Sequence, residues 1–365
     1  MLPDVLTVNA GSTSVKLSRR ADGRDRPAPP DLDAALDSDD EPAVVIHRVV
    51  HGGTRTKPEV LDDAAVQALR DLTELAPLHQ PPALDAIARC RRRWPSATQI
   101  ACFDTSFHSS MPAAARTYAL PARLREWVQV YGFHGLSHAW ACGQARRAVP
   151  AGRRVLVAHL GGGQSLCGAR DGRSVVTTMG FTPVDGLVMA TRSGTIDPAA
   201  VLYLTRHTGE DLDKVLESES GLTGLAGTGD MRVILERRRA GDLEAELAMA
   251  VWRHRFLRQA GGCIAVLGGL DVLVFTGGIG ENSAEVRALV AEDLGWFGVA
   301  VRADDAGLAT ATADLSGTAG VSGAAGVSGA ADVSALGAPV RTLVVHARED
   351  LQMIADAEAL LAESR

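Results

Sequence analysis

The segments VLTVNAGSTSVKL (residues 5–17) and VLVAHLGGGQSLCG (residues 155–168) contain the same features in the same order. Each begins with a short apolar run, passes through a polar residue into a glycine-containing turn, and ends in a second strand-like run. This pattern predicts a β-hairpin, because turn-forming residues separate two runs of strand-forming residues. Its return about 150 positions later indicates an internal duplication, and the rest of the chain is interpreted around it.

Strand-like and helix-like segments alternate along the rest of the chain. Short apolar runs predict strands at 43–50, 98–103, 271–276 and 340–346. Apolar residues at helical spacing predict helices at 60–76, 83–93, 242–267 and 349–363. Strands that alternate with helices are typical of an α/β fold with layered sheets.

Two segments are expected to be loops. Residues 20–42 are rich in Asp, Pro and Ala, and residues 306–338 are a low-complexity run of Gly, Ala, Ser and Val. We therefore predict a loop at 20–42 and a flexible surface loop at 306–338.

Composition excludes several classes of protein. The 365 residues suffice for two domains, and the net charge of −7 argues against nucleic acid or an anionic membrane as a partner. Five widely spaced cysteines without a C-x-x-C pair indicate a reduced, cytoplasmic protein without a disulfide framework. We expect no signal peptide and no transmembrane span. A Walker A loop is excluded as well, because none of the three lysines follows a glycine.

Two segments of the first half offer groups for an anion. The loop Asn9–Lys16 is rich in hydroxyls and backbone N–H groups, which can surround a phosphate, although an ordinary polar β-turn would look the same. Arg48 lies within an apolar strand, where a charge is costly unless it forms a salt bridge or faces a ligand. Val50 shares its face of the strand, so the pair would suit a short carboxylic acid.

An acid and a histidine follow in the next motifs. Asp104 comes directly after the strand at 98–103, in FDTSFH (103–108), where it either takes part in chemistry or caps the next turn. In YGFHGLSH (131–138) no carboxylate or cysteine accompanies His134 and His138, so a catalytic His134 is favoured over a zinc site.

Three glycine-rich segments complete the set of candidates. They are residues 180–198 with Arg192, residues 220–232 with Arg232, and residues 276–282 after a strand. Glycines allow a flat ligand to approach the backbone. The first two segments also fit surface loops with a solvated arginine, and Asn282 and Glu285 fit the start of a helix.

In this order the motifs resemble those of the acetate kinases of the sugar kinase/actin superfamily, from residue 4 to the last helix except for 20–42 and 306–338. The resemblance implies two duplicated ribonuclease H-like (actin-like ATPase) domains with an interdomain cleft. Residues 1–106 with 350–365 would form the first domain, and residues 107–349 the nucleotide-binding domain. It further implies a homodimer that transfers a phosphoryl group reversibly from ATP to acetate, giving acetyl phosphate and ADP with Mg²⁺, or alternatively Mn²⁺.

The resemblance also assigns roles to individual residues. The catalytic residues would be Arg48, Asp104, His134 and Arg192. Beside Arg48, the acid would contact Val50, Leu78, His79, Phe133 and Pro183. The nucleotide would contact Asn9, Ser12, Ser14, Lys16, His159, Gly161, Gly162, Gly163, Asp230, Met231, Arg232, Gly277, Gly278, Ile279, Gly280 and Asn282. Asn9 and Glu349 would hold the metal.

Three positions depart from the family pattern. Gly162 replaces an asparagine of the second phosphate loop, Arg348 replaces an asparagine and adds a charge beside Glu349, and Thr228 replaces a serine. These departures leave open a nucleotide-binding homologue with weakened catalysis. A propionate or butyrate kinase on the same scaffold is the other alternative.

Overall fold

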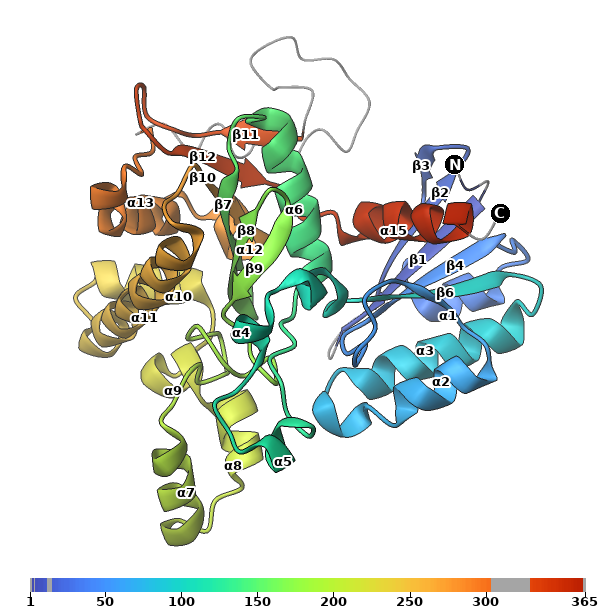
Figure 1. Cartoon of the computed structure of the whole chain (residues 1–365), viewed down its shortest axis with the longest axis horizontal. Helices are drawn as coiled ribbons and strands as arrows, with labels where there is room; N and C mark the ends of the chain where they lie inside the picture. Colours follow the sequence, from blue (N-terminus) through green and yellow to red (C-terminus); the bar gives the residue numbers. More distant parts are fainter. Residues whose placement is uncertain (1, 3, 12–14, 303–328, 364–365) are drawn as a thin grey trace. The chain divides into compact units, whose positions relative to one another are not determined.

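The computed structural model describes residues 2, 4–11, 15–302 and 329–363 (Figure 1). The chain divides into two compact units. The first unit comprises Met1–Ser109, Phe133–Trp140 and Arg348–Arg365, and the second comprises Ser110–Gly132 and Ala141–Ala347. The division expected from the sequence assigns Phe133–Trp140 to the second domain and differs from the observed units mainly there.

The first unit is built on a six-stranded mixed sheet of order β3-β2-β1-β4-β6-β5. β1 is antiparallel to β2 and parallel to β4, and β6 is parallel to β4. The strands are β1 (Asp4–Ala10), β2 (Val15–Ala21), β3 (Arg24–Arg26), β4 (Val44–Val49), β5 (Glu59–Val60) and β6 (Thr98–Phe103). The predicted first hairpin and the strands at 43–50 and 98–103 are confirmed.

Helices cover both faces of this sheet (Figure 1). Leu6 and Val8 of β1 pack against α3 (Gln80–Arg93), whereas Val5 packs on the opposite face against α15 (Glu349–Glu363). This division follows from the alternation of side chains along a strand. The remaining helices are α1 (Leu32–Asp37), α2 (Asp63–Arg70) and the short turns η1 (Thr73–Leu75) and η2 (Ser106–Ser110).

The prediction of a loop at 20–42 was wrong. β2 continues to Ala21, and β3 pairs with it through a two-residue turn at Asp22-Gly23. Both turn residues have positive φ, 52° and 75°, as the commonest tight hairpin turn requires. Asp31 then caps α1 by accepting a hydrogen bond from the Ala34 N–H.

The second unit contains a six-stranded sheet of order β11-β12-β10-β7-β8-β9. The strands are β7 (Arg154–Leu160), β8 (Gln164–Arg170), β9 (Arg173–Thr177), β10 (Val272–Thr276), β11 (Ala330–Asp332) and β12 (Arg341–Val345). β7 is antiparallel to β8 and parallel to β10, as β1 is to β2 and β4. The two sheets thus repeat one topology, which confirms the internal duplication.

The long helix α11 (Leu243–Leu267) packs on this sheet, where Trp252 and Phe256 join Leu156 and Phe275 in one buried cluster. The other helical segments of this unit are α4 (Ala113–Arg116), α5 (Ala122–Arg125), α7 (Pro198–His207), α8 (Leu212–Lys214), η3 (Val215–Glu219), α9 (Gly221–Ala226), α10 (Met231–Arg239), α12 (Gly277–Asn282), α13 (Ala284–Asp293) and η4 (Gly295–Phe297). The helix α6 (Gly135–Ala148) begins in the first unit and ends in the second. No helix in the described ranges is long and apolar enough to cross a bilayer.

The segment 306–338 is only partly described, because residues 303–328 lie outside the described residues. Within its described part, three residues form a strand and not a loop. Ala330–Asp332 forms β11, which pairs with β12 and buries Ala330 and Ala331. These residues form a strand despite their low-complexity composition, because the open edge of β12 offers hydrogen-bonding groups to their backbone.

Candidate active site

Three neighbouring strands of the first unit end in polar residues. Asn9 and Arg48 are register partners near the ends of β1 and β4, and Asp104 follows the end of β6. Because the three strands are parallel, their carboxyl ends meet at one edge of the sheet. The structure therefore brings these predicted site residues together.

Arg48 is the centre of this cluster. Its Nε donates to Asp104 Oδ1 at 3.0 Å and its Nη2 to Asp104 Oδ2 at 2.6 Å, and its Nη1 donates to Asn9 Oδ1 at 3.0 Å. Burial lowers the pKa of Arg48, but the carboxylates of Asp104 and Glu349 outweigh burial, so the net pKa is raised. Burial raises the pKa of Asp104 and the Arg48 guanidinium opposes that rise. Arg48 is thus a fixed cation with a defined orientation.

Glu349, the first residue of α15, completes the cluster. Asn9 Nδ2 donates to Glu349 Oε2 at 2.7 Å, and the same oxygen lies 3.8 Å from Arg48 Nη1. Asn9 therefore bridges the arginine and the acid. The result is two carboxylates, an amide and a guanidinium on one edge of the sheet.

His134 lies in a turn whose backbone is hydrogen-bonded to Asp104. Its φ of 57° is in the left-handed region, which is uncommon for a residue other than glycine. The backbone N–H of His134 is hydrogen-bonded to the Asp104 carboxylate, and the Gly135 N–H donates to the Asp104 carbonyl at 2.9 Å. A Cβ at position 135 would overlap that carbonyl oxygen. These contacts also explain why Phe133–Trp140 belongs to the first unit.

His108 supports the same turn and was not singled out from the sequence. Its Nε2 donates to the Phe133 carbonyl at 2.9 Å, and its ring lies against His138 with centroids 5.6 Å apart. Burial lowers the pKa of His108 to about 4, so the imidazole is neutral near pH 7. The sequence points to His108 only in that it lies in the same short segment as Asp104, FDTSFH (103–108).

The residues expected to contact the acid have different environments. Val50 and Phe133 are buried in the first unit, whereas Leu78 is 46% exposed. The Phe133 ring lies 5.7 Å from that of His51. His79 precedes α3 as its N-cap residue, and Pro183 is buried in the second unit. Their role in binding an acid stays a prediction.

In the second unit, two glycine loops adjoin. The Gly161 N–H donates to the Gly163 carbonyl at 3.2 Å, and the Ala190 N–H donates to the Gly162 carbonyl at 3.0 Å. A Cβ on Gly161 would lie 4.0 Å from the Gly278 nitrogen, whereas one on Gly162 would meet nothing within 4 Å. Residues 161–163 and the start of α12 thus present backbone groups side by side.

The glycine-rich segment after β10 forms the short helix α12, and its carboxylate Glu281 was not predicted as a site residue. Glu281 Oε1 accepts hydrogen bonds from the Gly277 N–H at 2.8 Å and the Ala347 N–H at 3.0 Å, and Oε2 contacts His346. Burial raises the pKa of Glu281, but these hydrogen bonds give a net lowering. At its end, Asn282 Nδ2 donates to the Gly278 carbonyl at 2.8 Å.

The other predicted nucleotide contacts occupy varied places. Asp230 is the N-cap residue of α10 and forms a two-point contact with the exposed Arg232, whereas Met231 is buried in the core. Ile279 is partly buried, and Gly280 is buried within α12. His159 is near the end of β7, and Lys16 is exposed at the start of β2. Ser12 and Ser14 lie outside the described residues.

Arg192 is held within a polar loop of the second unit. Its Nη1 donates to the Pro183 carbonyl at 3.3 Å, and its carbonyl accepts from the Met189 N–H at 3.1 Å. Burial lowers its pKa and Glu217 partly opposes this. An arginine stays protonated in proteins, so the loop presents a partly desolvated cation.

The charge that Arg348 adds beside Glu349 has two acidic partners. Its guanidinium pairs with Asp350 and Asp25. A cation with two acidic partners is largely neutralised at short range.

The donor set suits magnesium only in part. No group of three or more His, Cys, Asp and Glu side chains within the described ranges is placed to hold a metal ion. The Glu349 carboxylate and the Asn9 amide oxygen are nevertheless the hard oxygen donors that Mg²⁺ prefers. Mg²⁺ commonly takes one or two protein ligands and completes its shell with water and phosphate. The residues present therefore fit this ion together with a nucleotide.

Several known proteins are similar to this chain in sequence, and several solved structures are similar to it in fold. The acetate kinase of Pseudarthrobacter chlorophenolicus is 46% identical over 276 residues, covering 73% of this chain and 70% of that protein. The acetate kinase of Micrococcus luteus is 41% identical over 351 residues, covering 85% and 90%.

Among solved structures, a propionate kinase from Francisella tularensis has a TM-score of 0.82 at 28% identity, covering 97% of this chain and 99% of that one. The Porphyromonas gingivalis acetate kinase has a TM-score of 0.80 at 27% identity, covering 98% and 100%. These likenesses and the two repeated sheets confirm the expected actin-like ATPase fold. The acetokinase family matches residues 31–352. The chain therefore belongs to the acetokinase family.

Proposed function

We propose that this protein is an acetate kinase, which transfers the γ-phosphoryl group of ATP to acetate and runs reversibly. The observation that carries the proposal is the Arg48 cluster, in which a buried, oriented guanidinium meets Asp104, Asn9 and Glu349 in a chain of the acetokinase family.

The reaction requires alignment and charge compensation more than covalent help from the protein. An acetate oxygen forms a bond to the γ-phosphorus, the bond from that phosphorus to the β–γ bridging oxygen breaks, and ADP leaves with the electron pair. In this assignment Arg48 orients acetate, and Arg192 and His134 stabilise the phosphoryl group in transit. Asp104 fixes Arg48 and the His134 turn through the contacts described above.

The nucleotide is assigned to the second unit. The backbone groups at Gly161–Gly163 and Gly277–Gly280 would receive phosphates and adenosine, helped by Asp230 and Arg232. Asn9 and Glu349 would hold Mg²⁺, or Mn²⁺ in its place. The ion, when bound, neutralises charge on the phosphate oxygens.

Propionate is the second candidate substrate, because a propionate kinase is among the structural neighbours at 28% identity. One extra methylene in an apolar pocket changes binding by only about 1–3 kcal/mol. A broad preference among short acids is therefore expected, with acetate first.

The test is a coupled assay of ADP formation with acetate, propionate and butyrate under saturating ATP and Mg²⁺, together with hydroxamate detection of the acyl phosphate. We expect the highest kcat/KM with acetate. A higher kcat/KM with propionate or butyrate would move the assignment to that acid. The absence of acyl phosphate with all three would leave a nucleotide-binding homologue with weakened catalysis.

We also propose a homodimer in the cytoplasm. α7 has no buried residue, and its Leu202 and Tyr203 are 55% and 60% exposed, as expected for a face that a second copy covers. All five cysteines are buried and unpaired, which suits a reducing compartment. Light scattering of the wild type and of Tyr203→Glu tests the assembly, with a dimer expected for the first and a monomer for the second.

A further inference from the structure

Two adjacent acids at the start of α15 face different partners. Glu349 accepts a hydrogen bond from Asn9 Nδ2 and lies near Arg48, whereas Asp350 interacts with Arg348 and Ser18. Successive residues of an α-helix point about 100° apart, so the side chains of Glu349 and Asp350 can reach different partners. The helix alone does not fix these two orientations, because the first turn is the part of a helix that frays most readily.

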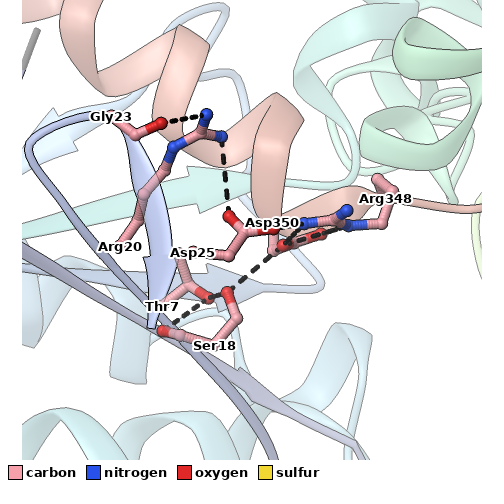
Figure 2. A network of polar contacts seen from close by, with 7 residues as sticks. All are labelled: Thr7, Ser18, Arg20, Gly23, Asp25, Arg348 and Asp350. Atoms are coloured by element: carbon pink, nitrogen blue, oxygen red, sulfur yellow. Dashed lines mark hydrogen bonds and ion pairs between the residues drawn. The ribbon is translucent and has the colours of Figure 1, made fainter. Parts of the chain in front are cut away.

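Arg348 engages Asp350 through several hydrogen bonds. Its Nε donates to Oδ1 at 2.9 Å and to Oδ2 at 3.2 Å, and its Nη2 donates to Oδ2 at 2.8 Å. Nη2 also reaches Asp25 Oδ2 at 3.4 Å. The hydrogen bond to Asp350 raises the pKa of Arg348, burial lowers it, and the charges of Asp350 and Asp25 raise it further, so the net pKa is raised. Figure 2 shows this guanidinium beside the carboxylates of Asp350 and Asp25.

The same network reaches the sheet of the first unit. Asp350 Oδ2 accepts from Ser18 Oγ at 3.3 Å, and Ser18 Oγ shares a hydrogen bond of 2.6 Å with Thr7 Oγ1 (Figure 2). On the other side, Asp25 pairs with Arg20 at 3.8 Å, and Arg20 Nη2 donates to the Gly23 carbonyl at 2.7 Å. The first turn of α15 is thereby tied to β1, β2 and the β2–β3 turn.

An arginine at this position needs a specific reason. Arg348 directly precedes α15, and its carbonyl accepts from the Leu351 and Gln352 N–H groups. A cation at a helix N-terminus is opposed by the helix dipole, so its acidic partners must compensate. Without Arg348, Asp350 would be a second carboxylate one residue from Glu349, and it would compete for the same cations.

We propose that Arg348 is a positioning residue that turns Asp350 toward the sheet and leaves Glu349 as the one acid of this turn presented to Asn9 and Arg48. The proposal rests on the proposed function, in which Glu349 serves the magnesium ion. It concerns a residue at which the sequence departs from the family pattern.

The experiment compares Arg348→Asn with the double variant Arg348→Asn/Asp350→Asn. The matched control is Lys57→Ala, because Lys57 pairs with Glu363 at 2.7 Å at the opposite end of α15. The first readout is amide hydrogen exchange of residues 351–354 in the protein without nucleotide or metal. The second is the Mg²⁺ concentration that gives half-maximal acyl phosphate formation.

For Arg348→Asn we expect exchange at 351–354 to accelerate about tenfold or more, because the first turn loses its tether. We expect the half-maximal Mg²⁺ concentration to rise about tenfold, within the range typical of lost outer-shell partners, while kcat at saturating Mg²⁺ changes little. The double variant should recover most of the Mg²⁺ dependence, because the competing carboxylate is gone. Lys57→Ala should alter neither readout.

Wild-type exchange and Mg²⁺ dependence in Arg348→Asn would overturn the proposal. A double variant whose half-maximal Mg²⁺ concentration is as high as that of the single variant would also overturn it, since Asp350 would then not compete with Glu349. Failure of the proposed function is recognised separately with Glu349→Gln. If that variant retains wild-type turnover and Mg²⁺ dependence, Glu349 is not the metal ligand, whatever the exchange rates show.

Discussion

The Arg48 guanidinium contacts both carboxylate oxygens of Asp104, at 3.0 Å from Nε and 2.6 Å from Nη2, and Asp104 is only 1% exposed. Removing one member of such a buried pair leaves the other charge uncompensated, which typically costs about 3–5 kcal/mol. We therefore expect Arg48→Ala to lower the free energy of unfolding by about this amount and to abolish most activity. Arg48→Lys should retain the charge but lose the two-point contact, with an intermediate effect.

Urea unfolding monitored by circular dichroism measures this loss. The control is Arg153→Ala, because Arg153 forms the same two-point contact with Asp171 on the surface. That variant should unfold nearly like the wild type, since solvent screens exposed pairs. Equal stability of Arg48→Ala and the wild type would show that Asp104 is not a buried charge.

The Gly135→Ala variant probes the His134 turn. A Cβ at 135 would overlap the Asp104 carbonyl oxygen, so the backbone of the turn must shift and move His134 with it. Because a small misplacement of a catalytic group is costly, we expect kcat to fall about 10²-fold. Gly143→Ala in the same helix is the control, since its Cβ would meet nothing within 4 Å and alanine favours helix by about 0.5–1 kcal/mol. Normal kcat in Gly135→Ala would separate the turn from catalysis.

Local patterns predicted the strands that carry the site, because apolar runs and the polar residues at their ends are visible in the sequence. Arg48 and Asp104 were identified in this way. The contact between Asn9 and Glu349 joins residues 340 positions apart, and only the sheet topology brings them together. The partners of Arg348 are likewise not visible in the sequence, because the composition of residues 20–42 predicts a loop where Asp22-Gly23 joins β2 to β3. The role of His108 depends on its burial, which is a tertiary property that the sequence does not show.

The Gly162→Asn variant restores the residue usual in the family at the second phosphate loop. Nothing lies within 4 Å of a Cβ at this position, so the side chain should enter without strain. An amide donor near the phosphates should lower the KM for ATP about three- to tenfold, the effect of one ordinary hydrogen bond of about 0.5–1.5 kcal/mol. Steady-state kinetics at saturating acetate measures this.

Stability gives the control for that variant. Gly162→Asn should unfold like the wild type, whereas Gly277→Ala should be destabilised, because Gly277 has φ of 79° and its Cβ would lie 2.8 Å from the Leu160 carbonyl oxygen. An unchanged or higher KM for ATP in Gly162→Asn would place the phosphates away from this loop.

Arg192→Ala tests the cation of the second unit. If Arg192 stabilises charge that develops on the transferred group, its removal should lower kcat about 10²–10³-fold. The fold should remain, because the loop is also held by backbone hydrogen bonds such as that from the Met189 N–H. Arg258→Ala, at an exposed position of α11, should leave kcat unchanged. Wild-type kcat in Arg192→Ala would remove this residue from the transfer step.

Stability should fall on the acidic side of neutrality. Burial lowers the pKa of His47, His51 and His108 to about 4 each. In the unfolded chain these histidines take up protons near pH 6.5. Between about pH 6.5 and 4 the unfolded state therefore binds more protons, so stability declines as pH falls through this window. Each histidine contributes of the order of 3 kcal/mol to the full decline.

Protonation of Asp356 changes stability in the opposite direction to protonation of the histidines, so this residue serves as the control. Burial raises its pKa to about 6, so below that pH the folded state takes up a proton before the unfolded state does, and stability is gained. Asp356→Asn removes this gain together with the partly buried charge. We expect the variant to be more stable than the wild type at pH 7 and to lose stability more steeply between pH 7 and 5. Urea unfolding at pH 5, 6 and 7 measures both slopes. A wild-type free energy of unfolding that does not change over this range would mean that the buried histidines are protonated in the folded protein.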